Sequence, residues 1–214
     1  WAKGDDAHDA AMVEQLMARV HTLAQACDAA GWFETDEVLI TAGGSAVFDL
    51  VSRALRPALS RPVRGLLRSG CYLTHDDGFY RRLVQHVDQR LGCDGQGLRA
   101  ALEVWAVVQS CPEPGLALLG VGKRDLSFDM GLPVPLKFSP AGSTQAQSAP
   151  ADWHITALND QHAYLRWPPG ASAPRIGDRV GLGISHPCTT FDKWRWMPLV
   201  DEGYTVTGAI TTRF

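Results

Sequence analysis

The hydrophobic period of the sequence changes once, near residue 95, and this change constrains the fold more than any other feature. Before it, apolar residues recur at three- and four-residue intervals, as in an amphipathic helix: Met12, Leu16, Val20, Leu23 and Cys27, with Met17 and Ala24 widening the stripe. After "GCDGQG", short β-type runs alternate with Gly and Pro. We therefore expect an α/β domain over residues 1–94 and an all-β domain over residues 95–214.

Two strand–loop–helix units follow the first helix, which we expect to end at Gly31. "EVLITAGGSAVFDLVSRAL" reads as a strand, a Gly-Gly-Ser turn and a helix. "VRGLLRSGCYLTHDDGFYRRLVQHVDQRL" repeats this order, with a strand near residues 65–72, a polar turn at 74–78 and a helix to Leu91. Successive units of this kind predict the later part of an α/β barrel or a doubly wound sheet.

A complete eight-fold barrel takes about 250 residues, and only about two of its units precede the β domain here. The sequence also opens on Trp1 rather than Met. We therefore expect the first half of the barrel to be missing and the chain to be a fragment, a processed product or a trimmed form.

Five runs after the change of period predict the strands of the β domain. They are residues 98–111, 115–122, 153–167, 178–186 and 203–214. The Ser-, Ala- and Gln-rich stretch at residues 139–152 predicts a surface loop between two of these strands.

The charge and cysteine content exclude several classes of partner. With 20 Lys and Arg against 23 Asp and Glu and no basic stripe, nucleic acid is not an expected partner. No apolar run reaches the roughly 18 residues of a membrane span, so we expect no membrane association. The five cysteines are scattered without Cys-x-x-Cys spacing, which favours reduced thiols and the cytoplasm.

The stretch "GLGISHPCTTFDKW" places His186 and Cys188 two residues apart. In a strand, residues i and i+2 point to the same face, so a strand here would direct imidazole and thiolate toward one point. That donor pair suits zinc and leaves positions open for water or substrate, whereas a carboxylate in place of Cys188 would favour manganese or magnesium. From the spacing alone, two unrelated side chains in an ordinary strand remain the alternative.

The segment "TAGGSA", residues 41–46, is a candidate anion site. Glycines between a strand and a helix leave backbone N–H groups free to approach a phosphate, and Ser45 adds a hydroxyl. The segment lacks the pattern of a nucleoside-triphosphate loop. A tight turn with Ser45 as the helix N-cap is the alternative.

The segment "YLTHDDGFY" carries Tyr72, His75, Asp76 and Asp77 beyond a predicted strand. We interpret Thr74 and the two acids as capping residues of the following helix. Tyr72 is the residue of this segment that we expect to face a site. We interpret Lys123, in "VGKRDLSFD", as part of a solvated turn rather than a nucleophile.

Four of these motifs, "TAGGSA", "RSGCYLTHDDGFY", "GKRDLSFD" and "ISHPCTTFDKW", together resemble the D-serine dehydratase-like family of pyridoxal-phosphate enzymes. This family is related to D-threonine aldolase and to the alanine racemase barrel. The resemblance covers essentially the whole chain but only the C-terminal portion of the family pattern. It implies the later part of an alanine-racemase-like (βα)8 barrel, followed by a C-terminal antiparallel β domain.

The resemblance also implies a site. Gly43, Gly44 and Ser45 would bind the cofactor phosphate and Tyr72 would lie near the cofactor ring. His186 and Cys188 would be the zinc ligands and, through the metal, the catalytic residues. The pair is His-x-Cys in dehydratase-like members and His-x-Asp in the aldolases.

The implied activity is dehydration and deamination of D-serine or a similar D-3-hydroxy amino acid, giving a 2-oxo acid and ammonia, in a homodimer. One departure from the family matters: its cofactor-binding lysine lies early in the barrel, and no lysine of this chain matches it. Two alternatives therefore stay open. They are retro-aldol cleavage as in D-threonine aldolase, and a noncatalytic chain that needs a separate segment to supply the rest of the barrel.

Overall fold

The computed structural model describes residues 2–93 and 96–213, which form two compact units. Unit 1 contains the described residues of 1–73 and 80–98, and unit 2 contains those of 74–79 and 99–214. The boundary expected between residues 94 and 95 lies outside the described residues. Segment 74–79 belongs to unit 2 by its contacts, although the residues on either side of it belong to unit 1.

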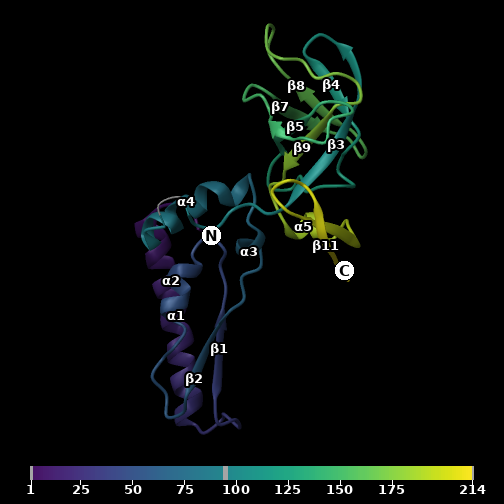
Figure 1. Ribbon diagram of the computed structural model, residues 1–214. Coiled ribbons are helices and arrows are strands. Elements are labelled where there is room, and N and C mark those ends of the chain that lie inside the picture. The colour runs from purple at the N-terminus through teal and green to yellow at the C-terminus, as the bar shows by residue number, and fades with distance from the viewer. Residues whose placement is uncertain (1, 94–95, 214) are drawn as a thin grey trace. The chain divides into compact units, whose positions relative to one another are not determined.

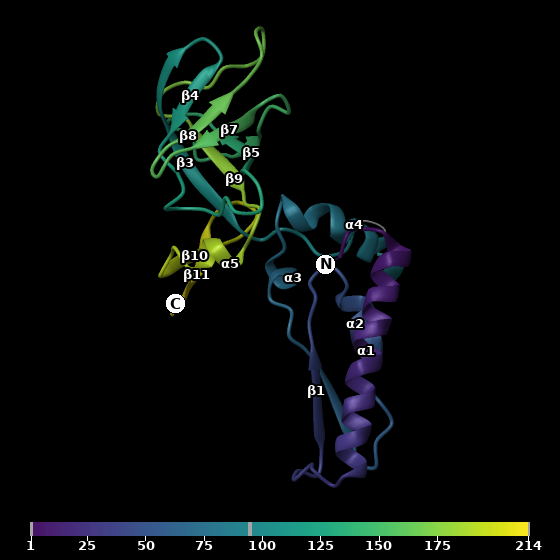
Figure 2. The ribbon, with the colours of Figure 1, turned by 180° about the vertical axis from the view of Figure 1, so that it is seen from behind.

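Unit 1 is built on two parallel strands, β1 (Val38–Ala42) and β2 (Val63–Leu67), which pair in register from Val38 opposite Val63 to Ala42 opposite Leu67. The long helix α1 (Asp6–Ala29) runs beside them (Figures 1 and 2). Helix α2 (Phe48–Arg53) follows β1. After β2 come the one-turn helix α3 (Cys71–Thr74) and helix α4 (Phe79–Leu91). The two predicted β-then-α units are thus present.

Helix α1 buries a narrower stripe than its sequence predicts. Val13, Met17 and Ala24 are buried against the inward residues of β1, whereas Leu16 and Leu23 are exposed. Strands β1 and β2 and the short helix α2 cover only part of the apolar face of α1. The helix ends at Ala29, and Gly31 follows with φ +69°, a left-handed conformation that favours glycine.

The second strand is shorter than predicted, and residues 71–74 are helical rather than extended. The last bond of the parallel pair is donated by the Arg68 N–H to the Ala42 carbonyl, at 2.9 Å. Beyond Ala42 the first strand leaves the sheet at Gly43. A strand continuing past Arg68 would therefore lack a partner.

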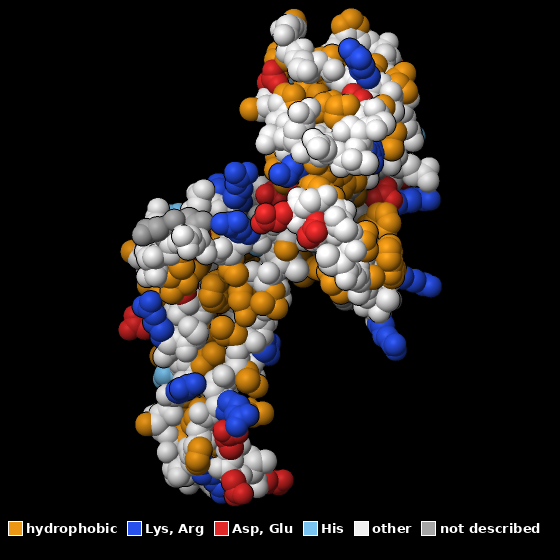
Figure 3. All heavy atoms as spheres, in the orientation of Figure 1, with side chains coloured by type: hydrophobic (Ala, Val, Ile, Leu, Met, Phe, Trp, Pro, Cys, Tyr) orange, Lys and Arg blue, Asp and Glu red, His pale blue; other side chains and the backbone are white. Residues whose placement is uncertain are grey.

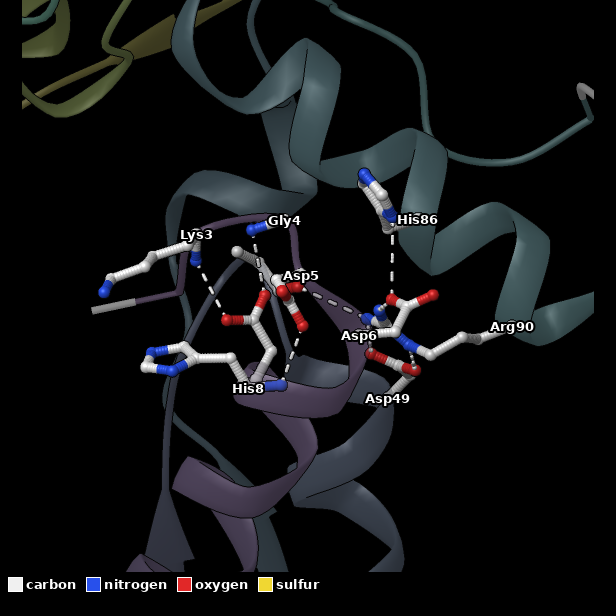
Figure 4. A network of polar contacts seen from close by, with 10 residues as sticks. Lys3, Gly4, Asp5, Asp6, His8, Asp49, His86 and Arg90 are labelled. Atoms are coloured by element: carbon white, nitrogen blue, oxygen red, sulfur yellow. Dashed lines mark hydrogen bonds and ion pairs between the residues drawn. The ribbon is translucent and has the colours of Figure 1, made fainter.

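A polar network fixes the start of α1 to the other helices of unit 1 (Figure 4). The buried Asp9 carboxylate accepts the N–H groups of Lys3 and Gly4, at 2.9 and 3.0 Å. Arg90, on α4, donates to Asp49 on α2 and to Asp6 on α1. Three segments that are distant in sequence are joined in this way.

Residues 99–213 of unit 2 form strands and, among them, one short helix. Seven antiparallel strands form a sheet in the order β6-β5-β9-β3-β4-β8-β7, which curls around an apolar core (Figures 1 and 2). The strands are β3 (Glu103–Glu113), β4 (Leu116–Leu119), β5 (Val134–Ser139), β6 (Gln147–Ser148), β7 (His154–Leu158), β8 (Ala163–Arg166) and β9 (Arg179–Gly183). Helix α5 (Cys188–Phe191) and the hairpin of β10 (Trp196–Val200) and β11 (Val206–Thr211) follow.

Strands β5 and β10 were not predicted. Each contains a proline, Pro135 or Pro198, which argues against a strand in the sequence. The pairing between β5 and β9 shifts register just after Pro135, and β10 pairs with β11 alone, so both prolines are accommodated. The predicted loop at residues 139–152 contains the two-residue strand β6.

All five cysteines lie within the described residues and are free thiols, as expected. Among the described residues, no helix combines the length and apolar composition that a membrane span requires.

Candidate metal centre

His186 and Cys188 lie beyond the end of β9 and not in a strand, so the predicted strand geometry is wrong. Strand β9 ends at Gly183, and Pro187 has helical dihedrals, φ −58° and ψ −43°. Its carbonyl accepts the N–H groups of Thr190 and Phe191, at 3.0 and 2.8 Å. The fixed φ of proline suits the start of a helix, and here it begins α5 with Cys188 as the first residue.

The turn nevertheless brings the two side chains together. A ring nitrogen of His186 and the Sγ atom of Cys188 lie within 4.8 Å of one another. Two ligands of a tetrahedral zinc ion stand about 3.5 Å apart, given zinc–nitrogen and zinc–sulfur bonds of about 2.0 and 2.3 Å. His186 is partly buried and Cys188 is exposed. The pair is thus close enough for a shared ion and open to solvent.

Residues 127–131 fix the backbone around this pair. The His186 N–H donates to Ser127 Oγ and the Ser127 N–H donates to Thr190 Oγ1, both at 3.0 Å. The Ser185 hydroxyl donates to the Gly131 carbonyl at 2.6 Å. Ser127, Ser185 and Thr190 are almost fully buried. These buried hydrogen bonds involve residues before and after His186 in the sequence, and they fix its backbone.

Asp129 contacts the imidazole itself. Its Oδ2 lies 2.6 Å from His186 Nδ1, and its Oδ1 accepts the Thr189 hydroxyl at 2.9 Å. Partial burial acts to raise the pKa of Asp129, but the hydrogen bonds from His186 and Thr189 outweigh it and the pKa is lowered. Sequence reasoning missed this residue: the quoted motif "GKRDLSFD" ends on it, but 57 residues separate it from His186.

Segment 74–79 packs against the residues just before His186. The Asp77 N–H donates to the Ile184 carbonyl at 3.0 Å. Gly78 allows the approach, because a Cβ atom there would lie 2.7 Å from Ser185 Cβ. Asp76 Oδ1 accepts the Gly78 N–H at 2.9 Å, one residue before α4 begins. That contact agrees with the predicted capping role of this segment.

The predicted phosphate segment lies in unit 1, between β1 and α2. A Cβ at Gly43 would stand 2.9 Å from the Arg68 carbonyl, and the Gly44 N–H donates to Ser69 Oγ at 2.7 Å. The close approach explains Gly43 without a ligand, and Gly44 has φ +152°, a conformation that residues with a Cβ rarely adopt. Val47, not Ser45, is the N-cap of α2, so the capping alternative for Ser45 is wrong. Binding of a phosphate by residues 43–45 stays a prediction.

Tyr72 lies in α3 rather than at a strand end. Its ring stacks on that of Phe48, with centroids 4.6 Å apart and planes inclined by 25°. Phe48 is the first residue of α2, directly after the Gly-Gly-Ser segment. The structure thus brings Tyr72 to the helix that follows the predicted phosphate loop, while its position relative to a cofactor stays a prediction.

Lys123 is exposed, in agreement with a solvated turn. Its Nζ lies 5.5 Å from the centroid of the Phe128 ring, and Lys193 Nζ lies 6.0 Å from the same centroid. These are cation–π distances at the surface of unit 2.

Comparison with known proteins finds a family model that matches part of the chain. Residues 101–200 match the family model described as "Putative serine dehydratase domain". A D-threonine aldolase from Arthrobacter sp. is 32% identical over 103 residues, which are 48% of this chain and 24% of that protein. The match therefore spans about a quarter of the length of that relative.

Solved structures show the same fold. D-threonine aldolase from Filomicrobium marinum aligns with a TM-score of 0.62 and 21% identity, over 92% of this chain and 48% of its own. D-threo-3-hydroxyaspartate dehydratase from Delftia sp. HT23 aligns with a TM-score of 0.60 and 17% identity, over 97% and 52%. An alanine racemase-like protein from Idiomarina loihiensis aligns at 0.54 and 12% identity, over 81% and 43%.

The predicted fold class, part of an alanine-racemase-like barrel followed by an antiparallel β domain, is confirmed by these structures and by the two units. The family match covers strands β3 to β10 of unit 2 together with His186 and Cys188, and it ends before β11. Residues 101–200, just under half of the chain, match the serine dehydratase domain model, in agreement with the D-serine dehydratase-like resemblance of the sequence.

Proposed function

We propose that His186 and Cys188 are the zinc ligands of a lyase that acts on D-3-hydroxy amino acids. The observation that carries the proposal is the proximity of the imidazole and the thiol in one turn, within 4.8 Å. Imidazole nitrogen and thiolate sulfur are donors that zinc prefers, and a site with two protein ligands leaves room for substrate. One solved structure is that of a cysteine-to-alanine variant of D-threo-3-hydroxyaspartate dehydratase in a metal-free form.

The donor set of His186 and Cys188 fits zinc. When bound there, zinc would supply a Lewis acid that assists departure of the substrate β-hydroxyl. The imidazole of His186 and the thiolate of Cys188 would hold the ion. The buried hydrogen bonds of Ser127 keep the turn that carries both residues in place. Exposure of Cys188 leaves one side of the pair accessible to a small molecule.

Residues 43–45 fit pyridoxal phosphate only in part. The strand, loop and helix follow in the required order, but the Gly44 N–H already donates to Ser69, and α2 begins three residues after Ser45. When bound, pyridoxal phosphate would supply an electron sink for the charge left by α-proton removal. No lysine of the chain matches the cofactor lysine of the family.

Within this family we favour dehydration, which gives a 2-oxo acid and ammonia, because the ligand pair is His-x-Cys as in dehydratase-like members. Retro-aldol cleavage is the second candidate, favoured by the 32% identity to a D-threonine aldolase. The two reactions leave different products. A 2-oxo acid identifies dehydration, and glycine with an aldehyde identifies aldol cleavage.

The test combines metal content with product analysis in a protein that contains this chain. The wild-type chain should retain about one zinc ion after dialysis. H186A and C188A should each lose zinc, whereas C111S, which alters another exposed thiol of unit 2, should retain it. With pyridoxal phosphate, D-serine and D-threonine, the expected product is a 2-oxo acid. If H186A and C188A retain zinc at the wild-type level, the assignment of the ligands is wrong. If wild type lacks activity but retains zinc, another segment must supply the missing lysine.

We also propose that the protein is a homodimer, as the family resemblance implies. The β10–β11 hairpin exposes large apolar side chains (Figure 3): Trp196, Leu199, Val200, Val206 and Ile210. Clustered apolar surface of this kind is typical of subunit contacts. Sedimentation should give twice the 23.2 kDa mass of the chain, and L199E should return it to a monomer. A monomeric wild type would contradict the proposal.

A further inference from the structure

We propose that Asp129 is the positioning residue of this metal site, and that it fixes the His186 ring so that Nε2 faces the ion. This inference rests on the proposed zinc site but concerns a residue outside the ligand pair. It follows from three contacts, which join residues 127–129 to the turn that carries both ligands.

The first contact sets the tautomer of His186. Its Nδ1 lies 2.6 Å from the Asp129 carboxylate, an acceptor without a proton of its own. The ring proton is therefore held at Nδ1, and Nε2 keeps the lone pair that a metal ion needs.

The second contact fixes the carboxylate. Asp129 Oδ1 accepts the hydroxyl of Thr189 at 2.9 Å, so both oxygens are engaged and the plane of the carboxylate is defined. Thr189 directly follows Cys188 in α5. The same carboxylate is thus bonded to one proposed ligand and to the neighbour of the other.

The third contact holds the backbone of His186. The Ser127 Oγ, two residues before Asp129, accepts the His186 N–H at 3.0 Å, and Ser127 is fully buried. Residues 127 and 129 therefore fix the histidine at both its main chain and its ring. This arrangement goes beyond the needs of a surface ion pair, which contributes little to stability.

Asp192 provides a matched control. Its side chain is 47% exposed, compared with 42% for Asp129, and it lies four residues after Cys188, where its partner is Lys193 at 3.6 Å. D192N removes the same charge from the same turn without contact to His186. T189V removes the hydroxyl that orients Asp129, and T189S retains it.

The experiment measures zinc affinity by chelator competition in the full chain, together with the ¹⁵N chemical shifts of the His186 ring in the metal-free protein. We expect D129A to lower zinc affinity about 10- to 100-fold, the usual effect of removing such a partner. D129N keeps an acceptor oxygen and should fall between D129A and wild type. T189V should show a smaller loss, and T189S and D192N should match wild type. In wild type, but not in D129A, the shifts should show a single Nδ1–H tautomer.

The controls separate the two proposals. If H186A and C188A lose zinc while D129A behaves like D192N in affinity and in ring shifts, the ligand pair stands and the role of Asp129 is wrong. If wild type takes up neither zinc nor cobalt, or if H186A and C188A bind as wild type does, both proposals fail. Far-UV circular dichroism checks that each variant is folded. A D129A variant that unfolds is replaced by D129N, whose ring shifts then decide.

Discussion

The guanidinium of Arg90 binds both oxygens of the Asp49 carboxylate, with Nε 2.7 Å from Oδ2 and an Nη nitrogen 2.9 Å from Oδ1. The Asp49 side chain is fully buried and that of Arg90 is 15% exposed. Hydrogen bonding to Asp49, with that to Asp6, raises the pKa of Arg90, so the guanidinium stays charged. R90A leaves a buried carboxylate without its cation, and we expect it to destabilise unit 1 by about 3–5 kcal/mol.

The double variant R90A/D49A tests this explanation, because it removes the isolated charge. It should be more stable than R90A alone, although it lacks more contacts. D6A, in which the lost partner is 53% exposed, should cost about 0–1 kcal/mol. Urea unfolding followed at 222 nm reports on unit 1, which contains the long helices α1 and α4. A double variant less stable than R90A would contradict the argument.

A methyl group at Gly78 should disturb the proposed metal turn. The added Cβ would lie 2.7 Å from Ser185 Cβ and 2.9 Å from Ser185 Cα, so the backbone before His186 must shift. We expect G78A to destabilise unit 2 by about 1–3 kcal/mol and to weaken zinc binding. G70A is the control, because a Cβ there has no neighbour within 4 Å among the described residues. Unchanged zinc affinity in G78A would show that the turn tolerates the shift.

Tyr204 should make the stability of unit 2 depend on pH in alkaline solution. Its hydroxyl donates to Glu103 Oε2 at 2.7 Å, and its ring meets Trp105 edge-on at 5.2 Å. Burial, followed by the hydrogen bond and charge of Glu103, raises the pKa of Tyr204. In the unfolded chain a tyrosine ionises near about pH 10. The stability that the neutral Tyr204 phenol contributes is therefore fully present below about pH 10. It is lost as the pH rises through the pKa of Tyr204 in the folded protein.

Y204F isolates this effect, since it keeps the ring but lacks the ionisable hydroxyl. The unfolding free energy of wild type should fall more steeply than that of Y204F between pH 9 and pH 11, measured by tryptophan fluorescence. The other tyrosines contribute equally to both proteins. Parallel curves would mean that the Glu103 contact does not hold the neutral phenol.

The sequence predicted those parts of the fold that depend on local pattern. The helical period around Met17 and the short β-type runs after residue 95 led to the correct classes of the two units. It did not predict how far the apolar stripe of α1 is covered, because exposure of Leu16 and Leu23 depends on what packs against the helix. Nor did it predict β5 or β10, whose prolines are tolerated only because of how those strands pair.

In the candidate site, too, local sequence pattern predicted some features, and contacts between distant residues determined the others. His186 and Cys188 are two residues apart, so local spacing made them candidates, and the family resemblance implied their role as ligands. Asp129 could not be found in this way, because folding of the sheet brings it to His186 across 57 residues. The conformation between the ligands was also predicted incorrectly, since Pro187 starts a helix where a strand was expected.

Replacing Cys188 with Asp should change the metal preference of the site. A thiolate is a soft donor that suits zinc, whereas a carboxylate is hard and suits manganese or magnesium. C188D should lower the ratio of zinc to manganese affinity by about tenfold or more, and competition dialysis with metal analysis measures this ratio. C111D adds the same carboxylate at another exposed cysteine of unit 2 and should leave the ratio unchanged. Equal ratios in C188D and wild type would mean that residue 188 does not bind the ion, and the chemistry of His186 would then need a different partner.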